Sequence, residues 1–347
     1  MFKGLVLFSA IIVMISGCSQ PDYRLFNVSY DPTREFYRDF NKAFIDHYKE
    51  QTGRNVRIEM SHGGSAAQTR NVINGLAADV VTLALAYDID KIAQQSGLLP
   101  PDWQSRLPHN STPYSSTVVF LVRKDNPKNI QSWEDLIRAD VEIIVADPRT
   151  SGVARWAYLA AWGYVLKQEL GDLSRLHDPD AAEDIAAAHE KAREYITALY
   201  GNVRILPQGA RAASQVFVQQ HSGDVLLDWE NQAKLTLDDF GKGRCEIVVP
   251  SISILAEPPV ALLDVNVDRR GTRQVAQAYL EFLYTKQGQE IIAQHYYRPR
   301  DTEVLAKYRD MFVEVELFTI DDVFGGWHKA QEEHFESGGV FEQLYMP

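Results

Sequence analysis

Short β-like runs alternate with amphipathic helical segments along most of this chain, and this alternation is the feature that most constrains its fold. Between the runs, apolar residues recur at helical spacing, as Phe36, Phe40 and Phe44 do. Alternation of this kind predicts an α/β fold with mainly parallel sheets. The β-like runs lie at 25–30, 55–60, 79–85, 117–122, 141–146, 203–206, 224–229 and 246–249.

Two stretches rich in proline and turn residues, 99–113 and 255–259, divide the chain into a beginning, a middle and an end. A chain of 347 residues is long enough for about two compact units. Two lobes joined by two crossings of the chain fit this division. The expected boundaries are 23–108 for the first part of lobe 1, 109–256 for lobe 2, and 257–347 for the second part of lobe 1 with C-terminal helices.

Residues 1–17 are predicted to form a signal peptide. Lys3 supplies the positive start, and the apolar run that follows is shorter than the about 20 residues that span a bilayer. Ser16 and Gly17 precede Cys18 and resemble the bacterial lipoprotein box, which implies a lipid on Cys18 and a tether at 18–22. We therefore expect a protein of the periplasm or cell surface, anchored to a membrane through Cys18. An ordinary secretory signal with an incidental cysteine is the alternative.

The charge balance excludes one class of partner. Lys and Arg total 35 against 47 Asp and Glu, which gives a formal net charge of -12. A nucleic-acid-binding protein must neutralise phosphates with cations, so no nucleic-acid partner is expected. The same negative charge repels an anionic ligand at long range, so an anion site in this chain must rely on local dipoles.

Cysteine usage argues against a disulfide framework. The chain has 2 cysteines, and lipidation of Cys18 would leave Cys245 without a partner. Cys245 opens the apolar run 245–249, which predicts a small buried strand residue rather than a reactive thiol.

Four β-like runs end in small or capping residues directly before a helical pattern. Their sequences are NVSYDPTR at 27–34, SHGGS at 61–65, DPRTSGVARW at 147–156 and, more weakly, PQGAR at 207–211. In the first, Asp31 is predicted to cap the helix that Pro32 begins. Helix N-termini carry unpaired N–H groups and about half a positive charge, and ligands of open α/β sheets bind beyond the carboxyl ends of the strands. Each loop alone is typical of capping, but four together predict an anion site.

Several long and unusual blocks of sequence resemble the sulfate-binding proteins of bacterial ABC importers, from about Tyr23 to the end of the chain. The resemblance implies a type II periplasmic-binding-protein fold, in which two lobes, each a mainly parallel sheet flanked by helices, close on one sulfate in the cleft between them. It further implies a monomer without enzymatic activity or cofactor, which delivers the anion to the permease subunits of an importer. The blocks lie at 27–34, 61–65, 78–88, 154–156, 159–163, 254–258, 297–300 and 324–327.

The resemblance also implies a site of neutral hydrogen-bond donors. His62, Arg155 and Arg211 are expected beside it without contacting the anion, the two arginines pairing with carbonyls or carboxylates. Without the resemblance, Trp229 is typical of a core tryptophan. The main-chain donors would be Asp31, Ser65, Gly152, Val153 and Ala210, and the side-chain donors Ser151 and Trp229.

The chain departs from the family pattern at two places. Gly152-Val153 stands where two consecutive glycines are common, and Ala212-Ala213 stands where small polar residues are usual. A main-chain N–H survives the change to Val, so sulfate binding is still expected. The branched side chain of Val153 is expected to tighten the pocket or to change the size of anion that it prefers.

Several other functions are compatible with parts of the sequence. The ligand could be another oxyanion than sulfate. Thiosulfate importers share the fold and nearly the same motifs, and molybdate is another tetrahedral oxyanion. A protonated phosphate is disfavoured because it needs a hydrogen-bond acceptor in the site. HGG at 62–64 followed by Ser65 is compatible with a secreted serine hydrolase, but no Gly-x-Ser-x-Gly motif accompanies it. The 9 histidines show no metal-ligand spacing, and His328 and His334, near Glu332 and Glu333, predict a solvated helix face.

Overall fold

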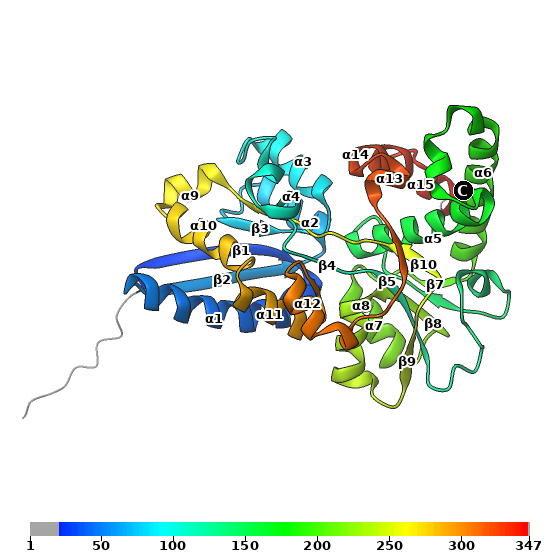
Figure 1. The fold of residues 1–347 in the computed structure, drawn as a ribbon, viewed down its shortest axis with the longest axis horizontal. Helices are drawn as coiled ribbons and strands as arrows, with labels where there is room; N and C mark the ends of the chain where they lie inside the picture. Colours follow the sequence, from blue (N-terminus) through cyan, green and yellow to red (C-terminus); the bar gives the residue numbers. More distant parts are fainter. Residues whose placement is uncertain (1–20, 346–347) are drawn as a thin grey trace, which may run out of the picture.

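The computed structural model describes residues 21–345. The predicted signal segment 1–17, the predicted lipid-bearing Cys18 and the start of the tether at 18–22 lie outside the described residues. Figure 1 shows two lobes side by side with segments of chain crossing between them. Within residues 21–345, no helix is long and apolar enough to cross a membrane. The prediction of an α/β fold with two lobes is confirmed by the order of the elements and by the two separate sheets.

Lobe 1 is built on β1 (Tyr23–Tyr30), β2 (Val56–Gly63), β3 (Val80–Thr82) and β11 (Val260–Leu262), in the order β11-β3-β1-β2. β1 runs parallel to β2 and β3, and β11 is antiparallel at the edge. The apolar stripe containing Phe36, Phe40 and Phe44 is buried on one face of α1, as its spacing predicts. The helices are α1 (Arg34–Thr52), α2 (Ser65–Ile73), α3 (Ala86–Ser96), α4 (Pro108–Ser111), α9 (Asp264–Arg270), α10 (Arg273–Phe282), α11 (Lys286–Gln294) and α12 (Thr302–Lys307).

Lobe 2 is built on β5 (Val118–Arg123), β6 (Ile143–Ile144), β7 (Val203–Ile205), β8 (Val225–Trp229) and β9 (Cys245–Val248), in the order β7-β6-β8-β5-β9. β6 is parallel to β7 and β8, but β5 is antiparallel to β8 and β9, so this sheet is less parallel than predicted. The reason is that the chain enters lobe 2 at the cleft and runs away from it along β5, whereas β8 returns and ends at Trp229. Cys245 is buried in β9, as predicted. The helices are α5 (Gly152–Leu170), α6 (Ala182–Gly201), α7 (Ala210–Val218) and α8 (Glu230–Thr236).

The chain crosses between the lobes once more than predicted. β4 (Tyr114–Ser115) pairs with β12 (Arg298–Pro299) on the way into lobe 2, and Ser116 bridges to Ala256 on the way back. A further crossing follows α12, after which β13 (Glu316–Phe318) pairs in parallel with β10 (Ile252–Ile254) (Figure 1). The C-terminal helices α13 (Ile320–Phe324), α14 (Trp327–Ala330) and α15 (Val340–Tyr345) therefore lie on lobe 2.

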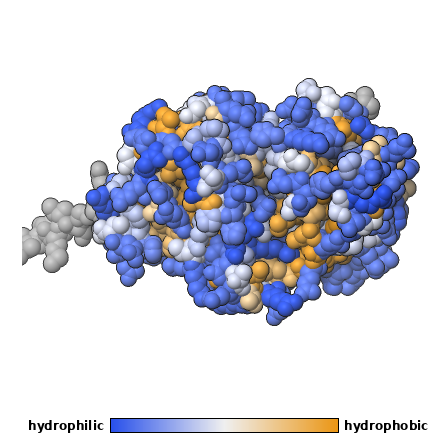
Figure 2. All heavy atoms as spheres, turned by 45° about the horizontal axis from the view of Figure 1, so that its top comes forward, coloured by the Kyte–Doolittle hydropathy of each residue, from blue (hydrophilic) through white to orange (hydrophobic). Residues whose placement is uncertain are grey.

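Helix α5 is buried on nearly all sides and holds the cleft end of lobe 2 in place. It packs against α6 and β10. A Cβ at Gly163 would lie 2.1 Å from the ring of Phe318, so the glycine lets β13 pack directly on the helix. The position of the N-terminus of α5 is consequently fixed by the core of the lobe. Figure 2 shows apolar residues at the surface in separate areas of the two lobes, with hydrophilic residues covering most of the visible face.

Candidate anion-binding site

A small pocket lies between the lobes, at the ends of several strands and the beginnings of several helices. We call it the anion pocket. Its volume, measured for the centre of a water-sized sphere, is about 10 Å³, so it has room for only a compact group. Within the described residues, no Lys, Arg or His lines it. Lobe 1 contributes Tyr30, Asp31, Pro32, Gly64, Ser65 and Ala84, and lobe 2 contributes Ser151, Gly152, Val153, Gly209 and Ala210.

Four helical segments begin at this pocket. α2 starts at Ser65, α5 at Gly152 and α7 at Ala210, and the 3-10 turn Asp31–Thr33 leads into α1. The first N–H groups of a helix have no acceptor within the helix, and the helix dipole places partial positive charge at the same end. The convergence of these ends makes an anion-binding environment without a cation. The structure thus brings together every predicted anion ligand except Trp229 in the pocket lining.

Ser151 supplies a buried side-chain donor at the start of α5. It is the N-cap residue, and its hydroxyl oxygen accepts a hydrogen bond from the Ala154 N–H at 3.4 Å. Because that bond uses the oxygen as an acceptor, the O–H remains able to donate. Ser151 is buried and lines the anion pocket, so this donor is available to a ligand there.

Trp229 ends β8 and contacts Tyr30, a residue of the pocket lining. Its side chain is fully buried, and its indole N–H has no hydrogen-bond partner within the described residues. Buried hydrogen-bond donors are nearly always paired, so we expect a ligand in the pocket to supply the acceptor for this indole N–H. The ring packs edge to face on Tyr30, which lines the pocket, with ring centroids 5.8 Å apart. The hydroxyl of Tyr30 in turn donates to that of Tyr297.

The hydroxyl of Ser65 is occupied by protein groups. It donates to the buried carboxylate of Asp88 and accepts from the Ala84 N–H at 3.0 Å. The ring of His62 lies instead beside the Thr33 hydroxyl, 3.4 Å away, and burial lowers the pKa of this histidine. Because Ser65 pairs with a carboxylate and not with His62, the pair expected of a serine nucleophile and its base is not formed.

Asp31 does not cap its helix as predicted. Tyr30 occupies the N-cap position, and the Asp31 carboxylate accepts a hydrogen bond from Arg34 Nε at 2.9 Å. The helical turn begins one residue earlier than expected, so Asp31 is its first residue and offers its own N–H at the N-terminus. The arginine pairs with one oxygen of the only carboxylate in the pocket lining within the described residues.

Arg155 and Arg211 both have partners outside the pocket. Arg211 Nη1 donates to Glu35 Oε1 at 2.7 Å, which joins α7 of lobe 2 to α1 of lobe 1. Arg155 Nε donates to the Pro148 carbonyl at 2.8 Å. Its Nη1 donates to Gln331 Oε1 at 3.0 Å. Neither guanidinium group lines the anion pocket.

Among the C-terminal histidines, the prediction of a solvated helix face is wrong for His334. His334 is fully buried among aromatic rings, its Nδ1 pairs with the Tyr158 hydroxyl, and burial lowers its pKa to about 3. His328 is exposed, as predicted, and pairs with Asp90 of lobe 1 at 3.0 Å. His334 differs from His328 because a π-helical turn at Gln331–Phe335 rotates its side chain into the core. In the described part of the chain, no cluster of three metal-ligating side chains occurs.

Sequence reasoning missed Tyr30, Pro32, Ala84, Gly64 and Gly209 as lining residues. Gly64 had a signal, because it lies in the SHGGS block, and a Cβ there would lie 2.8 Å from the Thr150 carbonyl oxygen of the other lobe. Tyr30 is the last residue of β1, and Ala84 lies two residues after β3. Both residues fall within blocks of sequence that carry the family resemblance, 27–34 and 78–88, but which side chains of a block line the pocket depends on how the lobes meet.

Comparison with known proteins places this geometry in context. Residues 35–298 match the family described as bacterial extracellular solute-binding protein. The sulfate-binding protein of Escherichia coli is 53% identical over 323 residues, which cover 93% of each chain. The thiosulfate-binding protein of Pseudomonas aeruginosa is 45% identical over 345 residues, which cover 98% of this chain and 99% of that one.

A solved structure agrees with these sequence matches. The sulfate-binding protein SubI from Mycobacterium tuberculosis superposes with a TM-score of 0.76 at 30% identity, covering 90% of this chain and all of that one. The match to the family includes strands and helices of both lobes, on both sides of the anion pocket. The chain therefore belongs to the family of bacterial extracellular solute-binding proteins.

Proposed function

We propose that this protein captures sulfate between its lobes outside the cytoplasm and delivers it to an ABC importer. The observation that carries the proposal is the buried, unpaired indole N–H of Trp229 beside a pocket onto which helix N-termini converge. Such a pocket offers a dianion many donors, and the one carboxylate of its described lining, Asp31, is paired with Arg34. The sulfate-binding relatives support the same ligand.

The anion is held by neutral groups in this proposal. The donors are the main-chain N–H groups of Asp31, Ser65, Gly152, Val153 and Ala210, together with the Ser151 hydroxyl and the Trp229 indole. His62, Arg155 and Arg211 support the surrounding loops without contacting the anion. Both walls of the pocket come from one chain, so a monomer forms the complete site.

Thiosulfate is the second candidate, because a thiosulfate-binding protein is similar to this chain over nearly its whole length. The buried side chain of Val153 in the pocket lining favours the more compact sulfate. A protonated phosphate would bring a hydrogen that needs an acceptor, and the Asp31 carboxylate already accepts a hydrogen bond from Arg34 through one of its oxygens.

Titration calorimetry with sulfate, thiosulfate, molybdate and phosphate tests the proposal. We expect a 1:1 sulfate complex that is tighter than the other three. A clear preference for thiosulfate or molybdate would reassign the ligand, and failure to bind any of the four would overturn the proposal. The sulfate affinity should change little between about pH 5 and 7, because amides, a hydroxyl and an indole do not titrate there.

We also propose that Cys18 carries lipid and anchors the protein to a membrane. The basis is the sequence alone, namely the apolar run that ends in Ser16, Gly17 and Cys18. Metabolic labelling with a fatty acid should label the wild-type protein and not Cys18→Ala, and the variant should lose its membrane association. Cys245→Ala is the matched control and should keep the label. Equal labelling of wild type and Cys18→Ala would contradict the anchor.

A further inference from the structure

A second and larger cavity lies next to the anion pocket, between α2 and α3 of lobe 1 and α5 and the C-terminal segment of lobe 2. Its volume is about 420 Å³. The two cavities share helix starts: Ser65 lines the anion pocket and Ala66 the larger cavity, while Gly152 lines the first and Arg155 the second. We call it the basic cavity, after its charged lining of Arg70, Lys91, Arg149, Arg155, Asp88 and Glu336.

Two of the four cations are engaged in the fold. Arg149 forms an ion pair with Asp147 at 2.7 Å. Arg155 lies 3.9 Å from Asp88, besides its bonds to the Pro148 carbonyl and to Gln331. Both arginines are on lobe 2, so these contacts hold one wall of the basic cavity in shape.

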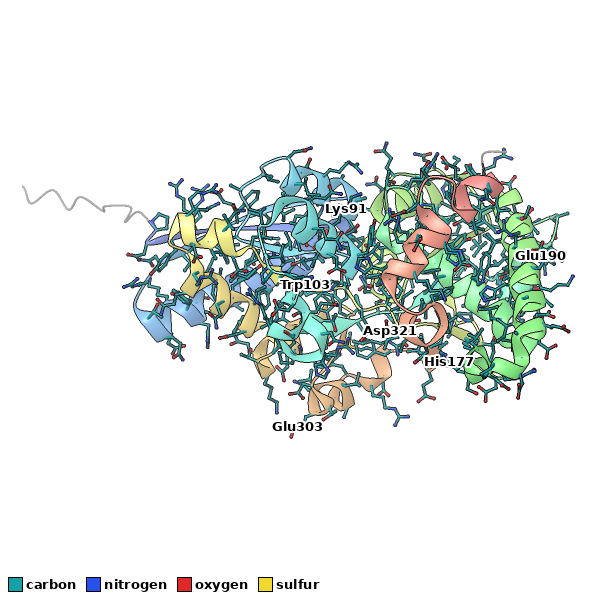
Figure 3. The ribbon with its side chains drawn as sticks, turned by 90° about the horizontal axis from the view of Figure 1, so that it is seen from above. Lys91, Trp103, His177, Glu190, Glu303 and Asp321 are labelled. Carbon is teal, nitrogen blue, oxygen red and sulfur yellow. The ribbon has the colours of Figure 1, made fainter. Side chains whose placement is uncertain are left out.

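The side chains of the other two cations make only longer-range electrostatic interactions with the protein. Within residues 21–345, the side chains of Arg70 on α2 and Lys91 on α3 make no hydrogen bond and no ion pair, but both charges act on the buried Asp88 carboxylate and partly offset the rise that burial causes in its pKa. Figure 3 shows Lys91 on the side of lobe 1 that is turned toward lobe 2. The carboxylate of Glu336, across the cavity, accepts a hydrogen bond from the Tyr87 hydroxyl at 3.1 Å. Two unpaired cations on neighbouring helices thus line a cavity that adjoins the anion pocket.

An anion approaching this protein meets a net charge of -12, which repels it. A local group of cations at a cleft can reverse that field nearby and raise the rate of association by about 10- to 10³-fold. Arg70 and Lys91 both belong to lobe 1, so they stay together when the lobes separate. They are therefore placed to attract an anion before the cleft closes.

We propose that the basic cavity is a second, weaker anion subsite, in which Arg70 and Lys91 capture sulfate before it moves to the anion pocket. This inference rests on the proposed function. The two sites differ in chemistry: the anion pocket uses buried neutral donors, whereas the basic cavity uses hydrated side-chain cations. Binding at the basic cavity is consequently weak and sensitive to salt, because salt screens charges that are in contact with water.

Stopped-flow measurement of tryptophan fluorescence on mixing with sulfate tests this proposal at low and high ionic strength. The Arg70→Gln/Lys91→Gln double variant should associate with sulfate about tenfold more slowly than wild type at low salt. The difference should shrink at high salt. The dissociation rate should be unchanged, because neither residue lines the anion pocket.

Two further variants make the result specific. Arg269→Gln/Lys242→Gln removes the same charge from exposed positions outside the cavity and should associate at the wild-type rate. Arg70→Lys/Lys91→Arg keeps the charge and should also keep the rate. An unchanged rate in the double Gln variant, or equal slowing in either of these two variants, would overturn the subsite while leaving sulfate binding intact. Failure of wild type to bind sulfate would overturn both proposals.

Discussion

At the scale of single residues, Ser151 and Trp229 are the side-chain donors that the proposed site depends on. Ser151→Ala and Trp229→Phe should each weaken sulfate binding by roughly 1.5–3 kcal/mol, the usual contribution of a hydrogen bond to a charged group. Titration calorimetry measures the loss. The exposed Ser174→Ala is the control and should bind as wild type does. Wild-type affinity in both site variants would show that the anion is held elsewhere.

Asp228, which precedes Trp229, makes stability depend on pH. Burial raises the pKa of the Asp228 carboxyl to about 8. Hydrogen bonds from the main-chain N–H of Trp229 and from the Ser214 hydroxyl act in the opposite direction and lower this pKa, but burial has the larger effect. An aspartate in the unfolded chain titrates near about pH 4, so between about pH 4 and 8 the folded state keeps a proton that the unfolded state releases. The contribution of this group to stability is therefore complete below about pH 4 and is lost as the pH rises toward 8.

Asp228→Asn replaces the titrating carboxyl with an amide that does not titrate, and it therefore tests this pH dependence of stability. Between pH 5 and 8 the free energy of unfolding of the variant should rise relative to that of wild type, because only the wild type loses stability through this group. Urea denaturation at several pH values measures the difference. A difference that stays constant across the range would mean that Asp228 does not titrate there.

At the scale of elements, the site depends on how closely two loops approach. Gly64 precedes α2, and a Cβ at this position would lie 2.8 Å from the Thr150 carbonyl oxygen in the loop before α5. At the adjacent Gly63, a Cβ would make only ordinary contacts, at 3.6 Å from the Gln68 side chain. Neither glycine has a positive φ, so the comparison isolates the space between the lobes.

Gly64→Ala should consequently hinder closure of the cleft. Overpacking of this kind costs about 1–3 kcal/mol, which should appear as weaker sulfate binding. The free energy of unfolding without sulfate should change less, because the clash exists only between closed lobes. Gly63→Ala is the matched control and should bind nearly normally. Calorimetry measures the sulfate affinity, and urea denaturation measures the free energy of unfolding. Equal sulfate affinity in Gly64→Ala and Gly63→Ala would contradict this reasoning.

The starts of the helices could be predicted from the sequence, whereas the direction of a strand could not. α2, α5 and α7 begin at Ser65, Gly152 and Ala210, inside the blocks where small and capping residues meet a helical pattern. Capping is a local interaction, so local sequence encodes it. The antiparallel course of β5 follows from where the chain enters lobe 2, and no residue within β5 signals it.

At the scale of the whole molecule, closure of the lobes involves contacts that do not touch the anion. The pair of Arg211 and Glu35 joins α7 to α1 at 2.7 Å, with 34% and 19% of the two side chains exposed. Ion pairs that still contact solvent are worth about 0.2–1 kcal/mol, and salt weakens them, though less when they are partly buried as this pair is. Arg211→Met should therefore weaken sulfate binding by no more than about 1 kcal/mol, which is less than the loss for Ser151→Ala.

Calorimetry of the two variants at low and high ionic strength distinguishes closure from direct binding. The deficit of Arg211→Met should shrink with salt, since screening already weakens the pair in wild type. The deficit of Ser151→Ala should persist. Loss of all binding in Arg211→Met, with normal binding in Ser151→Ala, would mean that a guanidinium group holds the anion.

The sequence by itself determined the α/β architecture, the helix starts that line the pocket and the burial of Cys245, because periodicity, capping and apolar runs act over a few neighbouring residues. Tertiary structure alone decided which residues meet. It placed Tyr30 against Trp229, turned His334 into the core, returned the C-terminal helices to lobe 2 and set Arg70 and Lys91 beside one cavity. These contacts join residues far apart in the chain, and their formation depends on packing and loop closure that no local segment encodes.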